Sequence, residues 1–124
     1  MVYIKVYGFT ENSQGIMNVE NDLKAEQAFV GGHIEVYPLT EYFLLVCNAD
    51  GINDGLEERA VVLGLGEGET ADLRGIQQVI HGDCFVCKFD GADGFESITN
   101  DDAEIIKHYV KKVVKVCDSV IEIE

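Results

Sequence analysis

Apolar and polar residues alternate in several segments of the chain, and this period of two predicts β-strands. The first such segment runs from Val2 to Phe9. His33–Leu39 alternates in the same way, whereas Tyr42–Cys47 is almost continuously apolar, which is typical of a strand buried on both faces. Asp83–Phe89 predicts another strand, and the alternating end of the chain, Val120–Glu124, predicts a last one.

A short segment has the period of three to four that predicts a helix. It comprises Leu23–Val30, and the preceding pair Asn21-Asp22 can cap its N-terminus. The pair Gly31-Gly32 follows, and a glycine there can take the left-handed conformation that closes a helix.

A longer helix is predicted from Asn100 to Cys117. Thr99 can cap it, and Asp102 three residues further on completes a capping box. The apolar stripe of this helix would consist of Ala103, Ile106, Val110, Val113 and Cys117. Acids at its start and lysines at its end agree with the helix dipole.

The order of these elements predicts an α+β fold in a single small domain, residues 1–124. A mostly antiparallel or mixed sheet would pack against the short helix in the N-terminal half and the long C-terminal helix. Residues 10–19 are expected to form a loop, and the glycine-rich acidic stretch 64–75 a surface excursion. The segment 75–81 fits a strand and a turn of helix equally well.

Composition narrows the class of protein, because 47% of the residues are apolar while the formal net charge is −14. The apolar share supports a core and excludes a disordered acidic tail. This charge disfavours direct binding to nucleic acid or to an anionic membrane, so the expected partner is a protein with a basic surface. The first segment lacks the apolar region of a signal peptide, and no run of eighteen apolar residues occurs, which together predict a cytoplasmic protein with free thiols.

The negative charge is uneven along the sequence. Thirteen acids and three basic residues lie between Glu35 and Asn100, and no Lys or Arg lies between Lys88 and Lys107. The acids of the second interval form the predicted binding face: Asp90, Asp93, Glu96, Asp101, Asp102 and Glu104. The alternative is that the charge only keeps the protein soluble.

Cys84 and Cys87 have the spacing of a redox pair or of half a zinc site. On a strand these two side chains point to opposite faces and cannot share an ion, so we expect them to pack in the core. The acidic turns lack the ligand spacing of a calcium loop, and Gly64–Gly68 lacks the lysine of a phosphate-binding loop. We therefore expect no metal, no cofactor and no catalytic residue.

The leading hypothesis is a non-enzymatic acidic binding protein, with a nucleic-acid mimic acting on a host defence or DNA-processing protein as its extension. The histidines stand at no diagnostic spacing from a serine or cysteine, but spatial triads can be invisible in a sequence. One alternative is therefore a small-molecule or metal-dependent enzyme with a pocket near Cys47, His33 or His81. A second alternative is a structural subunit that buries an apolar face in a homodimer.

Several segments resemble a known family in the same order along the chain. They are Val30–Val36, Leu45–Gly51, Gly55-Leu56 with Arg59-Ala60, Gly82–Val86 and Phe95–Asp101. Together they resemble the uncharacterised family called domain of unknown function 3846, from about residue 20 to residue 110. Members of that family occur largely in bacteria, phages and conjugative elements. The resemblance therefore implies such a source, and it implies no particular activity.

Overall fold

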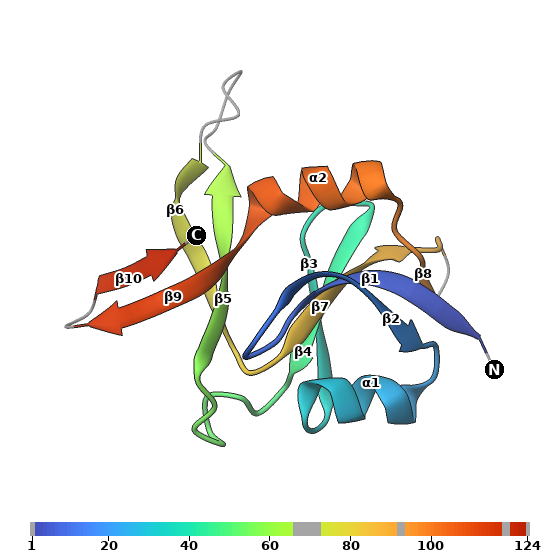
Figure 1. Cartoon of the computed structure of the whole chain (residues 1–124), viewed down its shortest axis with the longest axis horizontal. Coiled ribbons are helices and arrows are strands. Elements are labelled where there is room, and N and C mark those ends of the chain that lie inside the picture. Colours follow the sequence, from blue (N-terminus) through green and yellow to red (C-terminus); the bar gives the residue numbers. More distant parts are fainter. Residues whose placement is uncertain (1, 66–72, 92–93, 118–119, 124) are drawn as a thin grey trace.

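In the computed structural model, which describes residues 2–65, 73–91, 94–117 and 120–123, a six-stranded sheet lies between the two helices (Figure 1). This main sheet follows the path β2 (Gln14–Glu20), β1 (Tyr3–Phe9), β7 (Cys84–Phe89), β4 (Phe43–Asn48) and β3 (Ile34–Pro38), and β8 (Phe95–Glu96) also pairs with β7. Its paired strands are antiparallel throughout the described chain.

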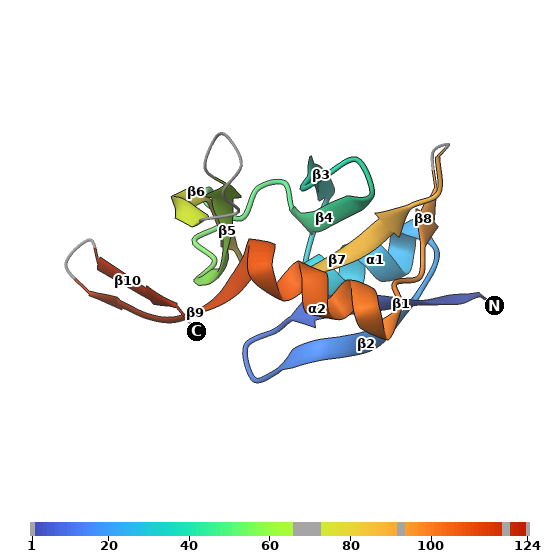
Figure 2. The same ribbon diagram turned by 90° about the horizontal axis from the view of Figure 1, so that it is seen from above.

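A second sheet follows the path β10 (Val120–Ile123), β9 (Val110–Cys117), β5 (Glu58–Leu65) and β6 (Leu73–His81), again with antiparallel neighbours. Helix α1 (Leu23–Val30) covers one face of the main sheet, while α2 (Asn100–Tyr109) and the second sheet pack against the other (Figure 1 and Figure 2). This is an α+β arrangement with mostly antiparallel strands, as expected. Within the described chain, no helix has the length and apolar character needed to cross a membrane.

Strand alternation divides the core into two clusters on opposite faces of the main sheet. The α1 cluster consists of Ile4, Val6, Val19, Val30, Val46, Phe85 and Cys87. The inter-sheet cluster includes Tyr7, Phe9, Leu45, Cys47, Ala60, Ile80, Cys84, Val86 and Ile106. Cys84 and Cys87 therefore face opposite ways, which confirms the prediction made from strand geometry.

The caps of both helices form as predicted. Asp22 accepts a hydrogen bond from the backbone N of Ala25 at 2.7 Å, and Gly31 closes α1 with a φ of 84°. In the capping box of α2, the backbone N of Thr99 donates to Asp102 Oδ2 at 2.8 Å, and the backbone N of Asp102 donates to Thr99 Oγ1 at 3.1 Å.

The C-terminal helix is the main correction to the sequence analysis. Helix α2 ends at Tyr109 rather than at the predicted Cys117, and the chain continues from Val110 as strand β9. Four of the eight residues of β9 are valines, which lose side-chain freedom in a helix and fit a strand better. The first residues of β9 also pair with Ala60–Val62 of β5, and this pairing stabilises the strand. Ile106 is buried, as the predicted helical stripe required.

Besides β9, four described strands lie where the sequence predicted none or left the choice open, namely β2, β5, β6 and β8. Strand β2 occupies part of the expected loop 10–19 and pairs with β1 along its whole length. In this hairpin Met17 covers Gly8 so closely that a Cβ atom on Gly8 would lie 2.5 Å from its sulfur. Strand β6 includes the unassigned segment 75–81. Most of the expected acidic excursion, residues 66–72, lies outside the described residues.

Candidate functional site

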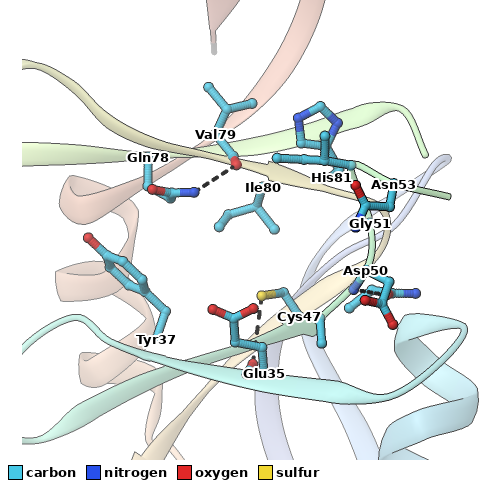
Figure 3. Close-up of a pocket in the computed structure, with 13 residues that line it drawn as sticks. Glu35, Tyr37, Cys47, Asp50, Gly51, Asn53, Gln78, Val79, Ile80 and His81 are labelled. Atoms are coloured by element: carbon cyan, nitrogen blue, oxygen red, sulfur yellow. Dashed lines mark hydrogen bonds between the residues drawn. The ribbon is translucent and has the colours of Figure 1, made fainter. Parts of the chain in front are cut away.

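The strands at the ends of the two sheet paths, β3 and β6, flank a cavity of about 240 Å³, which we call the inter-sheet cavity (Figure 3). The turn after β4 brings the two sheets together here. A Cβ atom on Gly51 would lie 2.6 Å from the backbone oxygen of His81, so only glycine permits this approach. The side chains that matter for its chemistry belong to Glu35, Tyr37, Cys47, Asp50, Gln78, Ile80 and His81.

Strand register explains why side chains from three strands meet in this space. Glu35 of β3 pairs with Cys47 of β4, and Cys47 belongs to the inter-sheet cluster, so Glu35 and also Tyr37 two residues on share that face. On β6, Ile80 belongs to the same cluster, and Gln78 shares its face. The cavity is thus the open end of the inter-sheet core, with an apolar floor and a polar rim.

The surroundings of Cys47 make its thiol a weak nucleophile. Burial, and then the nearby carboxylate of Glu35, raise the pKa of Cys47 to about 11. Its Sγ atom donates a weak hydrogen bond to the backbone oxygen of Glu35 at 3.7 Å. Because the thiolate is the nucleophilic form, a thiol with this pKa is a poor nucleophile at neutral pH.

Of the histidines named as candidates, the structure brings His81 to the cavity and not His33. The Nδ1 atom of His81 lies 2.9 Å from the backbone oxygen of Leu56, and a carbonyl can only accept, so Nδ1 donates to it. The imidazole lies on the far side of the cavity from the sulfur of Cys47 (Figure 3). The side chain of His33 is exposed and does not line the cavity. The described side chains at this cavity therefore form no thiol–imidazole pair.

The other described cysteines are buried at opposite faces of β7. Burial raises the pKa of Cys87 to about 12 and moves the pKa of Cys84 further in the same direction. Among the residues that the structure describes, no three His, Cys, Asp or Glu side chains are grouped as metal ligands would be. The side chains of both cysteines pack in the core, as the sequence suggested.

A second and wider hollow, of about 440 Å³, lies between the end of α1 and the start of β7. Its Arg59 donates from Nε to Asp83 Oδ1 at 3.0 Å and lies 3.7 Å from a carboxylate oxygen of Glu57. The one basic side chain among the described residues of this hollow is thus paired within the protein. By contrast, Glu35 and Asp50 at the inter-sheet cavity form no ion pair with any described residue.

The residues of the predicted acidic face are placed around β8 and the start of α2. Asp90, Glu96, Asp101 and Glu104 are exposed, and we call these four residues the acidic end. Asp93 lies outside the described residues. Glu104 forms an exposed ion pair with Lys107, whose Nζ atom lies 3.0 Å from its Oε1 atom.

Asp102 differs from the other acids of this face, because its carboxylate already has partners. It caps α2, and its Oδ2 atom lies 3.4 Å from Lys88 Nζ. Partial burial acts to raise the pKa of Asp102, but the hydrogen bonds with Thr99 and the charge of Lys88 outweigh it and hold the pKa below its ordinary value. Asp102 is therefore a structural residue, and a basic partner would have to break this arrangement to reach it.

Sequence reasoning found Cys47 and His81 but missed Glu35, Tyr37 and Gln78, which give the cavity its chemistry. Glu35 and Tyr37 belong to strand β3, which was predicted correctly. Their face of β3 becomes an inner face only because strand β6, which the sequence left unassigned, lies across the cavity from it. The available signal was the alternation of β3, which puts an acid and an aromatic residue on one face.

Comparison with known proteins gives one family. The model described as Domain of unknown function (DUF3846) matches residues 4–113, which extend from β1 into β9. No curated protein and no solved structure gives a significant match.

Proposed function

The chain belongs to the DUF3846 family of domains of unknown function, and we propose that this member is a non-enzymatic binding protein that holds a basic partner surface at its acidic end. The proposal starts from the site chemistry described above. A protonated Cys47 and a His81 directed at a backbone oxygen are better suited to packing and positioning than to nucleophilic catalysis.

The observation that carries the proposal is the separation of charge along α2. Asp101 and Asp102 stand in its first turn and Lys107 in its last, and Lys111 and Lys112 line the same small hollow as Lys107. Asp101 and Lys107 are six residues apart in α2, which is about 9 Å at 1.5 Å per residue. That distance is slightly longer than the screening length of about 8 Å at physiological ionic strength, so Lys107, which pairs with Glu104, only weakly offsets the field of Asp101.

Segregated charge distinguishes docking from mere solubility. Net charge spread over the whole surface is enough to keep a protein soluble. A charged end of one sign, by contrast, orients a partner and speeds its approach. Glu96 and Asp101 support this reading, because neither forms an ion pair with any described residue.

The extension of the proposal is that the acidic end mimics nucleic-acid phosphates toward a host defence or DNA-processing protein. Asp102 does not act as a surrogate phosphate, because its carboxylate is already paired with Lys88. Glu104 remains available, since its ion pair with Lys107 is exposed and solvent screening makes pairs of this kind weak. The surrogate phosphates are then the four carboxylates of the acidic end.

The test is affinity capture from the native host at low salt, with two baits of equal net charge. One carries Glu96→Lys, Asp101→Lys and Glu104→Lys. The matched control carries Glu11→Lys, Glu41→Lys and Asp54→Lys, which reverse three exposed acids elsewhere. We expect the first bait to lose a partner that the control and the unchanged protein retain, and circular dichroism to show that both remain folded. Equal capture by both variants would overturn the proposal.

Competition separates the general proposal from its extension. A nucleic-acid mimic occupies the DNA-binding surface of its partner, so added duplex DNA should release the captured protein. A partner that depends on the acidic end but is not displaced by DNA would support the docking function and refute the mimicry.

A further inference from the structure

We propose that the inter-sheet cavity is a binding site for a small organic cation, a molecule with one protonated amine and a compact apolar or aromatic body. The inference concerns a different surface from the acidic end and does not depend on the docking proposal. It rests on what lines the cavity, on the sign of its charge and on its size.

The inner part of the cavity suits an apolar body. Ile80 is 4% exposed and Cys47 is 7% exposed, and together they form its floor. Tyr37 is half-buried, packs against the inter-sheet cluster and presents its ring beside the opening (Figure 3). Apolar surface with an aromatic wall is typical of small-molecule sites, and such a ring also attracts a cation placed over its face.

The charge of the lining determines the sign of the ligand. The lining contains the carboxylates of Glu35 and Asp50 and no Lys or Arg among its described residues. Glu35 shares its face of β3 with Tyr37 and stands opposite Cys47, so its carboxylate borders the apolar floor. An ammonium group seated there would form a charge-assisted hydrogen bond next to apolar surface, where such bonds are stronger than in bulk water. An anion would meet repulsion instead.

The volume limits the size of the ligand. At the roughly 30 Å³ that one water occupies in the liquid, the cavity holds about eight water-sized groups. It is smaller than the roughly 300 Å³ at which drug-sized sites begin. A phenethylamine-like molecule has this size and combines the required ring and amine, and the Gln78 side chain at the rim offers a further acceptor.

A different reading of Glu35 is protection of a strand edge. Strand β3 ends the path of the main sheet, and charged residues on end strands discourage pairing between molecules. The two readings differ in the sign that they require. A lysine at position 35 would protect an edge as well as glutamate does, whereas it would repel an organic cation.

The experiment is a titration of the full chain with phenethylamine, followed by the amide signals in nuclear magnetic resonance spectra. Two probes of similar size replace the ammonium group of phenethylamine: 2-phenylethanol carries a neutral hydroxyl group there, and phenylacetate carries a negative carboxylate. We expect the amine to shift the signals of Tyr37, Cys47 and Gln78 in a saturable way, the alcohol to bind more weakly, and phenylacetate to leave them unchanged.

The decisive variants are Glu35→Gln and Glu35→Lys, with Glu41→Gln as the matched control. Glu41→Gln changes the net charge by the same amount as Glu35→Gln, but Glu41 is exposed and does not line the cavity. Loss of a charged hydrogen bond should weaken amine binding about tenfold or more in Glu35→Gln, abolish it in Glu35→Lys and leave it unchanged in Glu41→Gln. Glutamine at an exposed strand position leaves the fold intact, so reduced binding would not reflect unfolding.

Three outcomes would overturn the proposal. Equal amine affinity in Glu35→Gln and the unchanged protein would remove the anchoring role of Glu35. Shifts confined to the acidic end would show that the amine only follows the net charge. Glu35 would instead protect the strand edge if Glu35→Gln self-associated while Glu35→Lys remained monomeric, and if both variants bound the amine as the unchanged protein does.

Discussion

The two faces of the main sheet each place one acidic side chain near a buried cysteine, and the two acids differ in their access to water. On the face covered by α1, burial and then the charge of Glu26, which is only 5% exposed, raise the pKa of Cys87. On the other face, burial and then the charge of Glu35, which is exposed at the inter-sheet cavity, raise the pKa of Cys47. Burial, and then the charge of Asp22, also raise the pKa of Glu26 itself.

The protonation and binding chemistry of each acid therefore depends on whether its carboxylate is enclosed by protein or open to water. A carboxylate enclosed between its own helix and the sheet loses hydration and favours its protonated form, because no described cation pairs with it. A carboxylate at an open cavity keeps its water or exchanges it for a ligand. The α1 face is thus a packing surface, and the cavity face is where this fold exposes chemistry.

The largest expected difference between the α1 cluster and the wall of the inter-sheet cavity lies in what one aromatic side chain contributes to stability. Phe85 is fully buried in the α1 cluster, with the ring of Phe29 at 5.1 Å in an edge-to-face contact. Phe85→Ala should lower the free energy of unfolding by about 3–5 kcal/mol. Tyr37→Ala should lower it by about 1 kcal/mol, because the ring is only half-buried. Urea denaturation measures both, and comparable losses would show that the cavity wall is part of the closed core.

Sequence patterns predicted those parts of the fold in which local preference and tertiary environment agree. The strands β1, β3, β4 and β7 and the caps of both helices belong to this group. The boundary at Tyr109 does not, because Ile106 and Val110 suit a helix stripe and a strand alike. The pairing of β9 with Ala60–Val62, far away in the sequence, decides between them.

The candidate site was predictable only in part for a related reason. Cys47 and His81 stood out by residue type, and that signal is local. Glu35 gains its meaning from β6, which lies more than thirty residues further along and shows no clear period in the sequence. Its partners across the cavity are non-local, so the pattern of β3 alone indicated an ordinary exposed acid.

An intermediate effect is expected at the helix that covers the cavity face. Thr99→Ala removes one half of the capping box of α2 and should cost about 1 kcal/mol, whereas Thr99→Ser keeps the hydroxyl and should cost little. Because α2 supplies Ala103 and Ile106 to the inter-sheet cluster, the loss should appear in global unfolding by urea. If Thr99→Ala left the midpoint unchanged, α2 would be unfolding separately from the sheet that it covers.

The smallest effect is the most direct test of the two acids. Because the folded-state pKa of Glu26 is raised above its ordinary value of 4.5, its contribution to stability is fully present below pH 4.5 and is lost as the pH rises through the raised value. Glu26→Gln removes this loss, so the variant should be more stable than the unchanged protein at pH 7, with the difference shrinking toward pH 4. Glu35→Gln, at an exposed position, should leave the free energy of unfolding at pH 7 unchanged. Urea denaturation at pH 4, 5.5 and 7 measures the three proteins together. A Glu26→Gln variant that was less stable at pH 7 would mean that the enclosed carboxylate has a stabilising partner, and the α1 face could then no longer be regarded as a packing surface alone.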